Sequence, residues 1–136
     1  MTRTLRVFPC LLVLFVLASA AGFQAAQSPA APPAAKSKIL IITGDDVSPA
    51  HDWLSCASAS REVLLDSKRF DVDVVGGAEV LANEANLKGV DAIYLMLYNA
   101  RTPTLSDKGK ENLLAFVKGG KGLVVTHLSS ASFKEW

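Results

Sequence analysis

An apolar run at residues 39–43, four aliphatic side chains followed by Thr43 and then Gly44, limits most strongly what this chain can fold into. The run shows no alternation of polar and apolar residues. Continuous runs rich in isoleucine and leucine are typical of strands that are buried on both faces of a parallel sheet. The run therefore predicts a parallel sheet with helices on both of its faces.

Three further segments predict strands of the same sheet. Residues 70–75 alternate between polar and apolar side chains, so one face of that strand is expected to meet water. Residues 92–98 are a second buried run, and residues 122–126 follow a pair of glycines. Segments of helical character separate the four runs. This alternation predicts an open, right-handed, parallel α/β sheet in three layers.

Two of the intervening segments, residues 54–68 and 106–118, predict amphipathic helices. The second begins with Ser106, which suits a helix N-cap, and ends before Gly119. Residues 78–87 predict a weaker helix or an irregular crossover. The apolar residues expected to face the sheet are Leu54, Ala57, Ala59, Val63 and Leu64 in the first helix and Leu113, Leu114, Phe116 and Val117 in the second.

Residues 1–26 carry the pattern of a secretory signal peptide. A short positive segment, an apolar run at residues 7–17 and small residues at 18–20 follow one another in that order. The apolar run is shorter than the ~20 residues of a membrane span, so we expect cleavage rather than an uncleaved anchor, at residue 20 or near residue 26. Residues 27–37 are rich in alanine and proline and predict a linker. We expect an exported protein, periplasmic or secreted, that meets the membrane only during export.

Charge and cysteine content narrow the partners and the chemistry. The chain carries 14 basic and 13 acidic residues, and Arg3 and Arg6 lie in the leader, so the remainder has a formal charge of −1. Proteins that bind nucleic acid typically present a basic face, so we expect no nucleic-acid partner. Beyond Cys10 of the leader only Cys56 remains, which excludes an internal disulfide. We interpret Cys56 as a small buried residue rather than a nucleophile.

Polar side chains follow the carboxyl ends of the predicted strands, where ligands bind in open parallel sheets. The chain has two histidines, His51 and His127, and each lies shortly after a predicted strand. This convergence is the strongest indication of a site. The candidate residues are Asp45, Asp46, His51, Asp52 and Trp53 after the first strand, Asn99 and Arg101 after the third, and His127, Ser129 and Ser130 after the fourth.

Several chemistries fit these residues. His51, Asp52 and His127 are candidate catalytic residues, because a histidine near a carboxylate can act as a general base close to neutral pH. The two histidines are also candidate ligands of a divalent metal. Trp53 could stack on a sugar ring, and the remaining candidates for substrate binding are Asp45, Asp46, Asn99 and Ser129.

Each of these residues also has a structural interpretation. Asp52 suits a helix N-cap, Trp53 suits the core, and His127 suits hydrogen bonds to loop backbone. Several familiar motifs are absent from the sequence: the dinucleotide fingerprint G-x-G-x-x-G, the phosphate-binding loop and the nucleophile elbow G-x-S-x-G. His127 stands where an elbow nucleophile would follow the fourth strand.

Two motifs in residues 38–136 are specific enough to indicate a known family: the triplet His51-Asp52-Trp53 and the segment 119–127, Gly-Gly-Lys-Gly-Leu-Val-Val-Thr-His. On these motifs, residues 38–136 resemble the trehalose-utilisation (ThuA-like) family. Residues 38–44, 70–72 and 90–92 agree in order and spacing, as do Ser132, Phe133 and Trp136.

The resemblance implies a flavodoxin-like sheet of the class I glutamine amidotransferase-like kind, and a function in the metabolism of trehalose or of an oxidised sugar. It places His51, Asp52, Trp53 and His127 in a pocket; because a histidine replaces the nucleophilic cysteine, amidotransferase activity is not implied. Family domains are about twice as long, so residues 38–136 are expected to be an incomplete domain. An open apolar edge is expected at the fourth strand, or at whichever strand would neighbour the missing ones. Three alternatives stay open: an enzyme acting on a sugar derivative (an isomerase or a hydrolase), a non-catalytic carbohydrate-binding module, and an inactive fragment. The oligomeric state is left open.

Overall fold

The computed structural model describes residues 35–44, 52–98, 105–134 and 136. Its four strands form one sheet in which every neighbouring pair is parallel, in the order β2-β1-β3-β4. The predicted class, α/β with an open parallel sheet, is confirmed. The strands are β1 (Ser37–Thr43), β2 (Phe70–Gly76), β3 (Ala92–Leu95) and β4 (Gly122–Val125).

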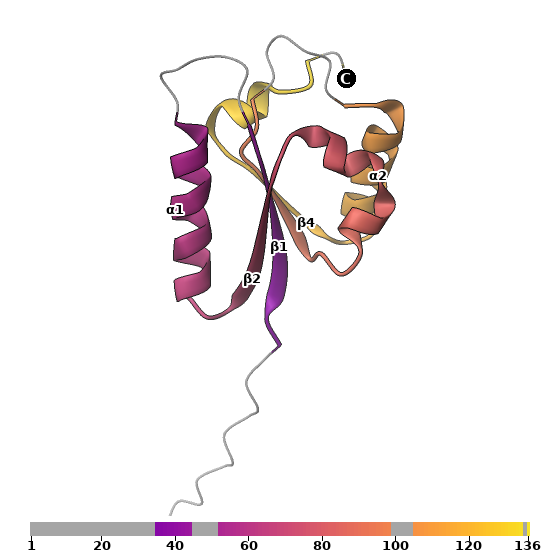
Figure 1. Ribbon diagram of the computed structural model, residues 1–136. Coiled ribbons are helices and arrows are strands. Elements are labelled where there is room, and N and C mark those ends of the chain that lie inside the picture. Colours follow the sequence, from indigo (N-terminus) through magenta and orange to yellow (C-terminus); the bar gives the residue numbers. More distant parts are fainter. Residues whose placement is uncertain (1–34, 45–51, 99–104, 135) are drawn as a thin grey trace, which may run out of the picture. The chain divides into compact units, whose positions relative to one another are not determined.

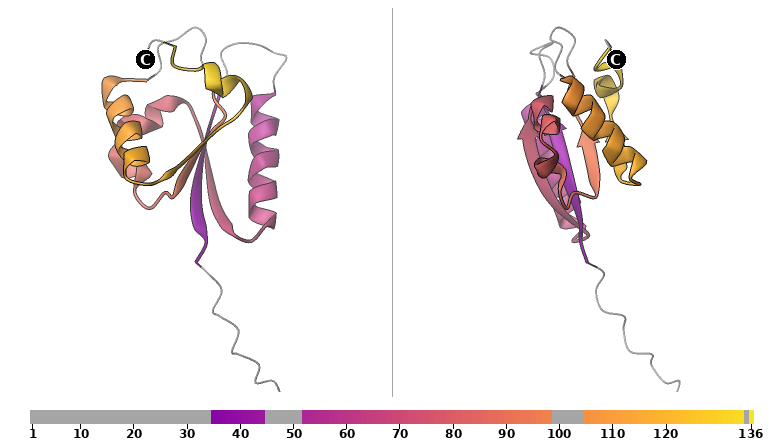
Figure 2. Two further views of the ribbon diagram at one scale, coloured as in Figure 1. Left: turned by 180° about the vertical axis from the view of Figure 1, so that it is seen from behind. Right: turned by 90° about the vertical axis from the view of Figure 1, so that its right-hand side faces the viewer.

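Helices cover both faces of the sheet, as the sequence predicts. Figure 1 shows α1 (Trp53–Asp66) on one side and α2 (Asp107–Lys118) on the other, and the view from behind in Figure 2 shows the same arrangement. Alternate residues of a strand point to opposite faces, and β1 therefore contributes to two separate cores. Ile39 and Ile41 pack in the cluster that includes Ala57 of α1. Leu40 and Ile42 pack in the cluster that includes Phe116 and Leu113 of α2.

The crossover from β2 to β3 consists of two short 3₁₀ helices, η1 (Ala78–Ala82) and η2 (Glu84–Leu87). The sequence predicts a weak helix or an irregular segment here, and the structure is intermediate between the two. η1 buries Ala78 and Leu81, and η2 buries Leu87. Both add to the core on the side of α2.

The apolar faces of both helices are narrower than predicted. Leu54 and Val63 of α1 are 59% and 71% exposed, and Leu114 and Val117 of α2 are 43% and 40% exposed. In α1 the helix packs against β1 and β2, and Ala57 is its one buried residue. In α2, Leu114 and Val117 line a shallow hollow together with Leu123 and Val125 of the edge strand β4.

Strand β4 forms an apolar edge of the sheet, as expected. All four of its residues are exposed, with Leu123, Val124 and Val125 at 38%, 50% and 41%. A central strand of a parallel sheet is normally covered on both faces. Together with Leu114, Val117 and Trp136, these side chains make up six of the eight large hydrophobic residues that are exposed in the described part of the chain.

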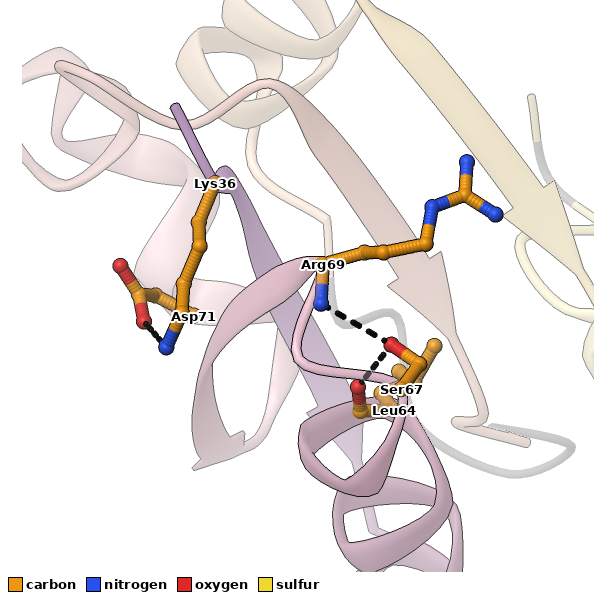
Figure 3. Close-up of polar contacts among 5 residues, drawn as sticks. All are labelled: Lys36, Leu64, Ser67, Arg69 and Asp71. Carbon is orange, nitrogen blue, oxygen red and sulfur yellow. Dashed lines mark hydrogen bonds and ion pairs between the residues drawn. The ribbon is translucent and has the colours of Figure 1, made fainter. Parts of the chain in front are cut away.

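Figure 3 shows how α1 is joined to β2 at the amino ends of the strands. The Ser67 hydroxyl donates to the Leu64 carbonyl at 2.6 Å, and its oxygen accepts from the Arg69 backbone N–H at 3.2 Å. Lys36, just before β1, forms an ion pair of 3.1 Å with Asp71 of β2. These contacts hold α1, β1 and β2 together at the amino ends of the strands, which is the end of the sheet opposite the carboxyl ends.

Candidate functional site

The direction of the chain reverses between β1 and β3, which are neighbours in the sheet. From β1 the chain moves outward through α1 to β2, and from β3 it moves the other way through α2 to β4. Ligands of open parallel sheets bind beyond the carboxyl ends of strands at such a reversal. A cavity of about 190 Å³ is lined by residues at the start of α1 and by residues that follow β3 and β4. Its lining residues are Trp53, Cys56, Met96, Tyr98, Thr126, His127, Leu128 and Ser129.

His127 occupies a sharp turn at the carboxyl end of β4. It begins the 3₁₀ helix η3 (His127–Ala131) with a φ of 49°, in the left-handed region. For a residue other than glycine this conformation costs roughly 1–2 kcal/mol. The Ser130 hydroxyl donates to the His127 carbonyl at 2.9 Å, and the Thr126 hydroxyl donates to the Leu95 carbonyl at 3.4 Å. The turn therefore holds an exposed imidazole at the edge of the cavity.

Trp53 is the first residue of α1 and lines the cavity. The Thr43 hydroxyl donates to the Trp53 carbonyl at 3.4 Å, which links the first turn of α1 to the end of β1. Asp52 is the N-cap: one oxygen accepts from the Ser55 backbone N–H at 3.0 Å and the other from the Ser55 hydroxyl at 2.6 Å. The hydroxyl and then the backbone N–H hold the pKa of Asp52 below its ordinary value. Asp52 does not line the cavity, so its carboxylate acts on the site by fixing the helix that presents Trp53.

Ser129 supplies the one buried polar side chain of this cavity. It is 5% exposed, and among the described residues its hydroxyl has no hydrogen-bond partner, while its backbone N–H donates to the Thr126 carbonyl at 3.0 Å. A buried hydroxyl without a partner costs roughly 1–3 kcal/mol. A ligand oxygen or a water would satisfy it.

Three of the predicted site residues, Trp53, His127 and Ser129, therefore line one cavity. The described residues contain no group of three or more His, Cys, Asp or Glu side chains placed to hold a metal ion. Metal binding by His51 and His127 stays a prediction, because His51 is not described. The other predicted residues outside the described ranges are Asp45, Asp46, Asn99 and Arg101.

Cys56 is the clearest correction to the sequence interpretation. We expect a buried residue, whereas the structure places an exposed thiol in the lining of the cavity. The adjacent Ala57 takes the position that faces the sheet. Residues three positions apart lie on the same side of a helix, so the spacing from Trp53 to Cys56 is a signal that could have identified it. Tyr98 was also missed, because the run at residues 92–98 assigns it to a strand.

A larger hollow, of about 800 Å³, lies between η2 and α2. Size alone would favour it as the main site. However, η2 leads into the amino end of β3, and in parallel sheets the carboxyl ends carry the ligand. We therefore place the candidate site at the smaller cavity, which also contains His127 and Ser129.

The described residues contain no helix long and apolar enough to cross a membrane. None of the protein-family models matches the chain. No curated protein matches it either.

A crystal structure of a protein from Parabacteroides merdae, named as ThuA-like, is similar in fold, with a TM-score of 0.61 and 23% sequence identity. The match covers 75% of this chain and 36% of that protein, so the chain spans about a third of the length of this relative. At this identity the likeness shows the fold alone, a parallel α/β sheet of the flavodoxin-like kind.

Proposed function

We propose that this chain is an exported domain of the ThuA-like type that binds a sugar or sugar derivative beyond the carboxyl ends of its strands and acts on it through His127. The observation that carries the proposal is the meeting of Trp53, His127 and Ser129 in one cavity. His127 is held there in a left-handed conformation. Backbone strain of this kind clusters at functional sites.

The size and lining of the cavity favour a small amphipathic ligand. A volume of about 190 Å³ is below the ~300–1,000 Å³ of pockets for drug-sized molecules, which suits one sugar ring rather than an oligosaccharide. Trp53 and Tyr98 bring aromatic rings to the lining, and aromatic faces pack on apolar surfaces while their rims hydrogen-bond. The Ser129 hydroxyl would pair with a ligand hydroxyl.

His127 is the residue that we assign to acid–base chemistry. Imidazole changes charge near neutral pH, and a positioned general acid or base contributes about 10²–10⁴-fold to a rate. Asp52 is assigned a positioning role, since both of its oxygens bind Ser55. Among the described residues, His127 and Cys56 are the only metal-ligating side chains in the lining. That is fewer than the three protein ligands typical of a catalytic zinc site, so a metal would also require His51 or an acidic neighbour of it.

The proposal is tested by sugar binding and turnover on the full chain. Trehalose, glucose and an oxidised keto derivative of glucose are titrated by calorimetry, and metal content is measured on the same samples. We expect His127→Asn, which keeps a residue that tolerates the left-handed turn, to abolish turnover and to weaken binding less than tenfold. Trp53→Ala should weaken binding at least tenfold.

Trp136→Ala is the matched control, because Trp136 is the second tryptophan of the chain and is not among the residues that line the cavity. Its binding and turnover should equal those of the wild type. The proposal fails if none of the three sugars binds, or if Trp53→Ala and Trp136→Ala behave alike. Binding without turnover in the wild type would leave a carbohydrate-binding module and overturn the catalytic role of His127.

Export is a separate part of the proposal, supported by the pattern of residues 1–26. Expression of the full precursor in a bacterium, followed by fractionation and N-terminal sequencing, tests it. We expect a mature protein outside the cytoplasm that begins after residue 20 or near residue 26. A cytoplasmic protein that retains its leader would contradict export.

A further inference from the structure

The hollow between η2 and α2 has a physical origin in the crossover from β2 to β3. Two short 3₁₀ helices, of five and four residues, cover this part of the sheet beside the twelve-residue α2. In Figure 1 they lie next to α2 on the same side of the sheet. The hollow of about 800 Å³ is lined by Glu84, Ala85, Leu87, Lys88, Lys108, Glu111, Asn112, Ala115 and Phe116.

Asn112, one of the lining residues, has a buried side-chain acceptor. The residue is 6% exposed, and its side-chain Nδ2 donates to the Leu81 carbonyl of η1 at 2.8 Å. A carbonyl oxygen can only accept, so this bond fixes which end of the amide is used. The other end, Oδ1, has no donor among the described residues. A buried acceptor without a donor is costly and is normally satisfied by protein, water or ligand.

The remaining lining combines an apolar floor with balanced charge. Leu87 and Phe116 are buried at 8% exposure each and belong to the core beneath. Two acidic and two basic side chains complete the lining, and one pair, Lys108 and Glu111, forms an ion pair of 3.4 Å. The charges of the lining cancel, so its field favours neither an anion nor a cation. An uncharged molecule with an apolar group fits this lining best.

We infer that this hollow is a second binding site, for a small uncharged amphipathic molecule that donates an N–H or O–H group to Asn112 Oδ1 and rests an apolar group on Leu87 and Phe116. Its volume lies within the ~300–1,000 Å³ that is usual for small-molecule pockets. The site shares no residue with the cavity at His127. A failure of the proposed function would therefore leave this inference unaffected, and a failure of this inference would leave the proposed function unaffected.

The test uses N-acetyl-leucine amide, an uncharged molecule with amide N–H donors and an isobutyl group, in an NMR titration of the ¹⁵N-labelled chain. We expect saturable shifts of the backbone amides of Lys88, Glu111 and Asn112, with millimolar affinity. A second probe with every amide N–H methylated should bind at least tenfold more weakly, because it cannot donate to Oδ1. The anion N-acetyl-leucine should also bind more weakly.

Two variants separate binding from folding. Ala115→Phe fills the hollow from the helix surface and leaves the Asn112–Leu81 hydrogen bond in place, so it should weaken binding at least tenfold. Ala59→Phe places the same side chain on an exposed position of α1 and should bind as the wild type does. The inference is overturned if Ala115→Phe binds normally, if the methylated probe binds equally well, or if no shift appears at these amides.

Discussion

Asp91 and Lys121 join the starts of two neighbouring strands, with Asp91 Oδ1 accepting a hydrogen bond from Lys121 Nζ at 2.8 Å. The other oxygen of the same carboxylate accepts from the Lys38 backbone N–H in β1, at 2.9 Å. One carboxylate therefore connects the amino ends of β1, β3 and β4. Hydrogen bonding from Lys121, and then from Lys38, holds the pKa of Asp91 below its ordinary value.

This pKa predicts how stability changes in acid. A carboxyl group whose pKa is lower in the folded chain stabilises it above the unfolded value, and this contribution is lost as the pH falls through the folded value. The loss should therefore develop below about pH 4, the unfolded value for aspartate being ~3.9. Urea unfolding between pH 2.5 and pH 7 should show a flatter acid decline for Asp91→Asn than for the wild type. Asp66→Asn, at a position without an ion pair in the described residues, should keep the wild-type slope; equal slopes in both variants would contradict the assignment.

The N-cap of α2 gives a second prediction. The Ser106 side-chain oxygen accepts from the Gly109 backbone N–H at 3.1 Å. Ser106→Ala should lower the free energy of unfolding by about 1 kcal/mol, because a backbone donor in the first turn loses its partner. Chemical denaturation measures the change. The control is Ser58→Ala inside α1, where alanine is the better helix former and stability should stay equal or rise by a few tenths of a kcal/mol.

The central strand should be the most sensitive part of the core. Ile41 is fully buried in β1, between β2 and β3. Ile41→Ala should cost about 2–5 kcal/mol and Ile41→Val about 0.5–1.5 kcal/mol, since lost burial and a residual cavity add together. Val63→Ala, at a position that is 71% exposed, should change stability by less than about 0.5 kcal/mol. Thermal unfolding of the three variants ranks them, and a cost for Val63→Ala equal to that for Ile41→Ala would refute the placement of the core.

Strand β4 should drive self-association of the isolated chain. Exposed apolar edge strands pair with other chains, and a lysine on such a strand opposes this. Val124 is 50% exposed in β4. We expect Val124→Lys to reduce light scattering at high protein concentration, while Val63→Lys, at a valine of α1 that is 71% exposed, leaves it unchanged. If the two lysine variants reduce scattering equally, net charge rather than the strand edge is the cause.

The fold could be predicted from the sequence to the extent that local pattern determines it. Continuous apolar runs identify β1 and β3 because both faces of these strands are buried, and Ser106 marks the start of α2 because an N-cap satisfies local backbone donors. The order β2-β1-β3-β4 cannot be predicted in this way, because neighbours in the sheet are distant in the sequence. The exposure of Leu54 and Val63 was missed for a related reason: a helix pattern does not say how much sheet the helix covers.

The candidate site was predictable only in part. The rule that ligands bind at the carboxyl ends of parallel strands places His127 and Ser129 correctly beside Trp53. Cys56 was missed because a lone cysteine in a helix suggests burial, and its exposure follows from a helix orientation that tertiary packing decides. The buried acceptor of Asn112 could not be foreseen either, since it depends on the hydrogen bond between Asn112 and Leu81 across 31 positions.

The position of β1 at the centre of the sheet has a consequence for synthesis on the ribosome. Both neighbours of β1 are made after it: Ile39 pairs with Val72 on one side and with Ala92 on the other. At roughly 5–20 residues per second, several seconds pass between the synthesis of β1, the most apolar strand, and the synthesis of its second partner, β3. During that interval one edge of β1 has no partner strand, and a slower ribosome would lengthen the time in which newly made chains can aggregate.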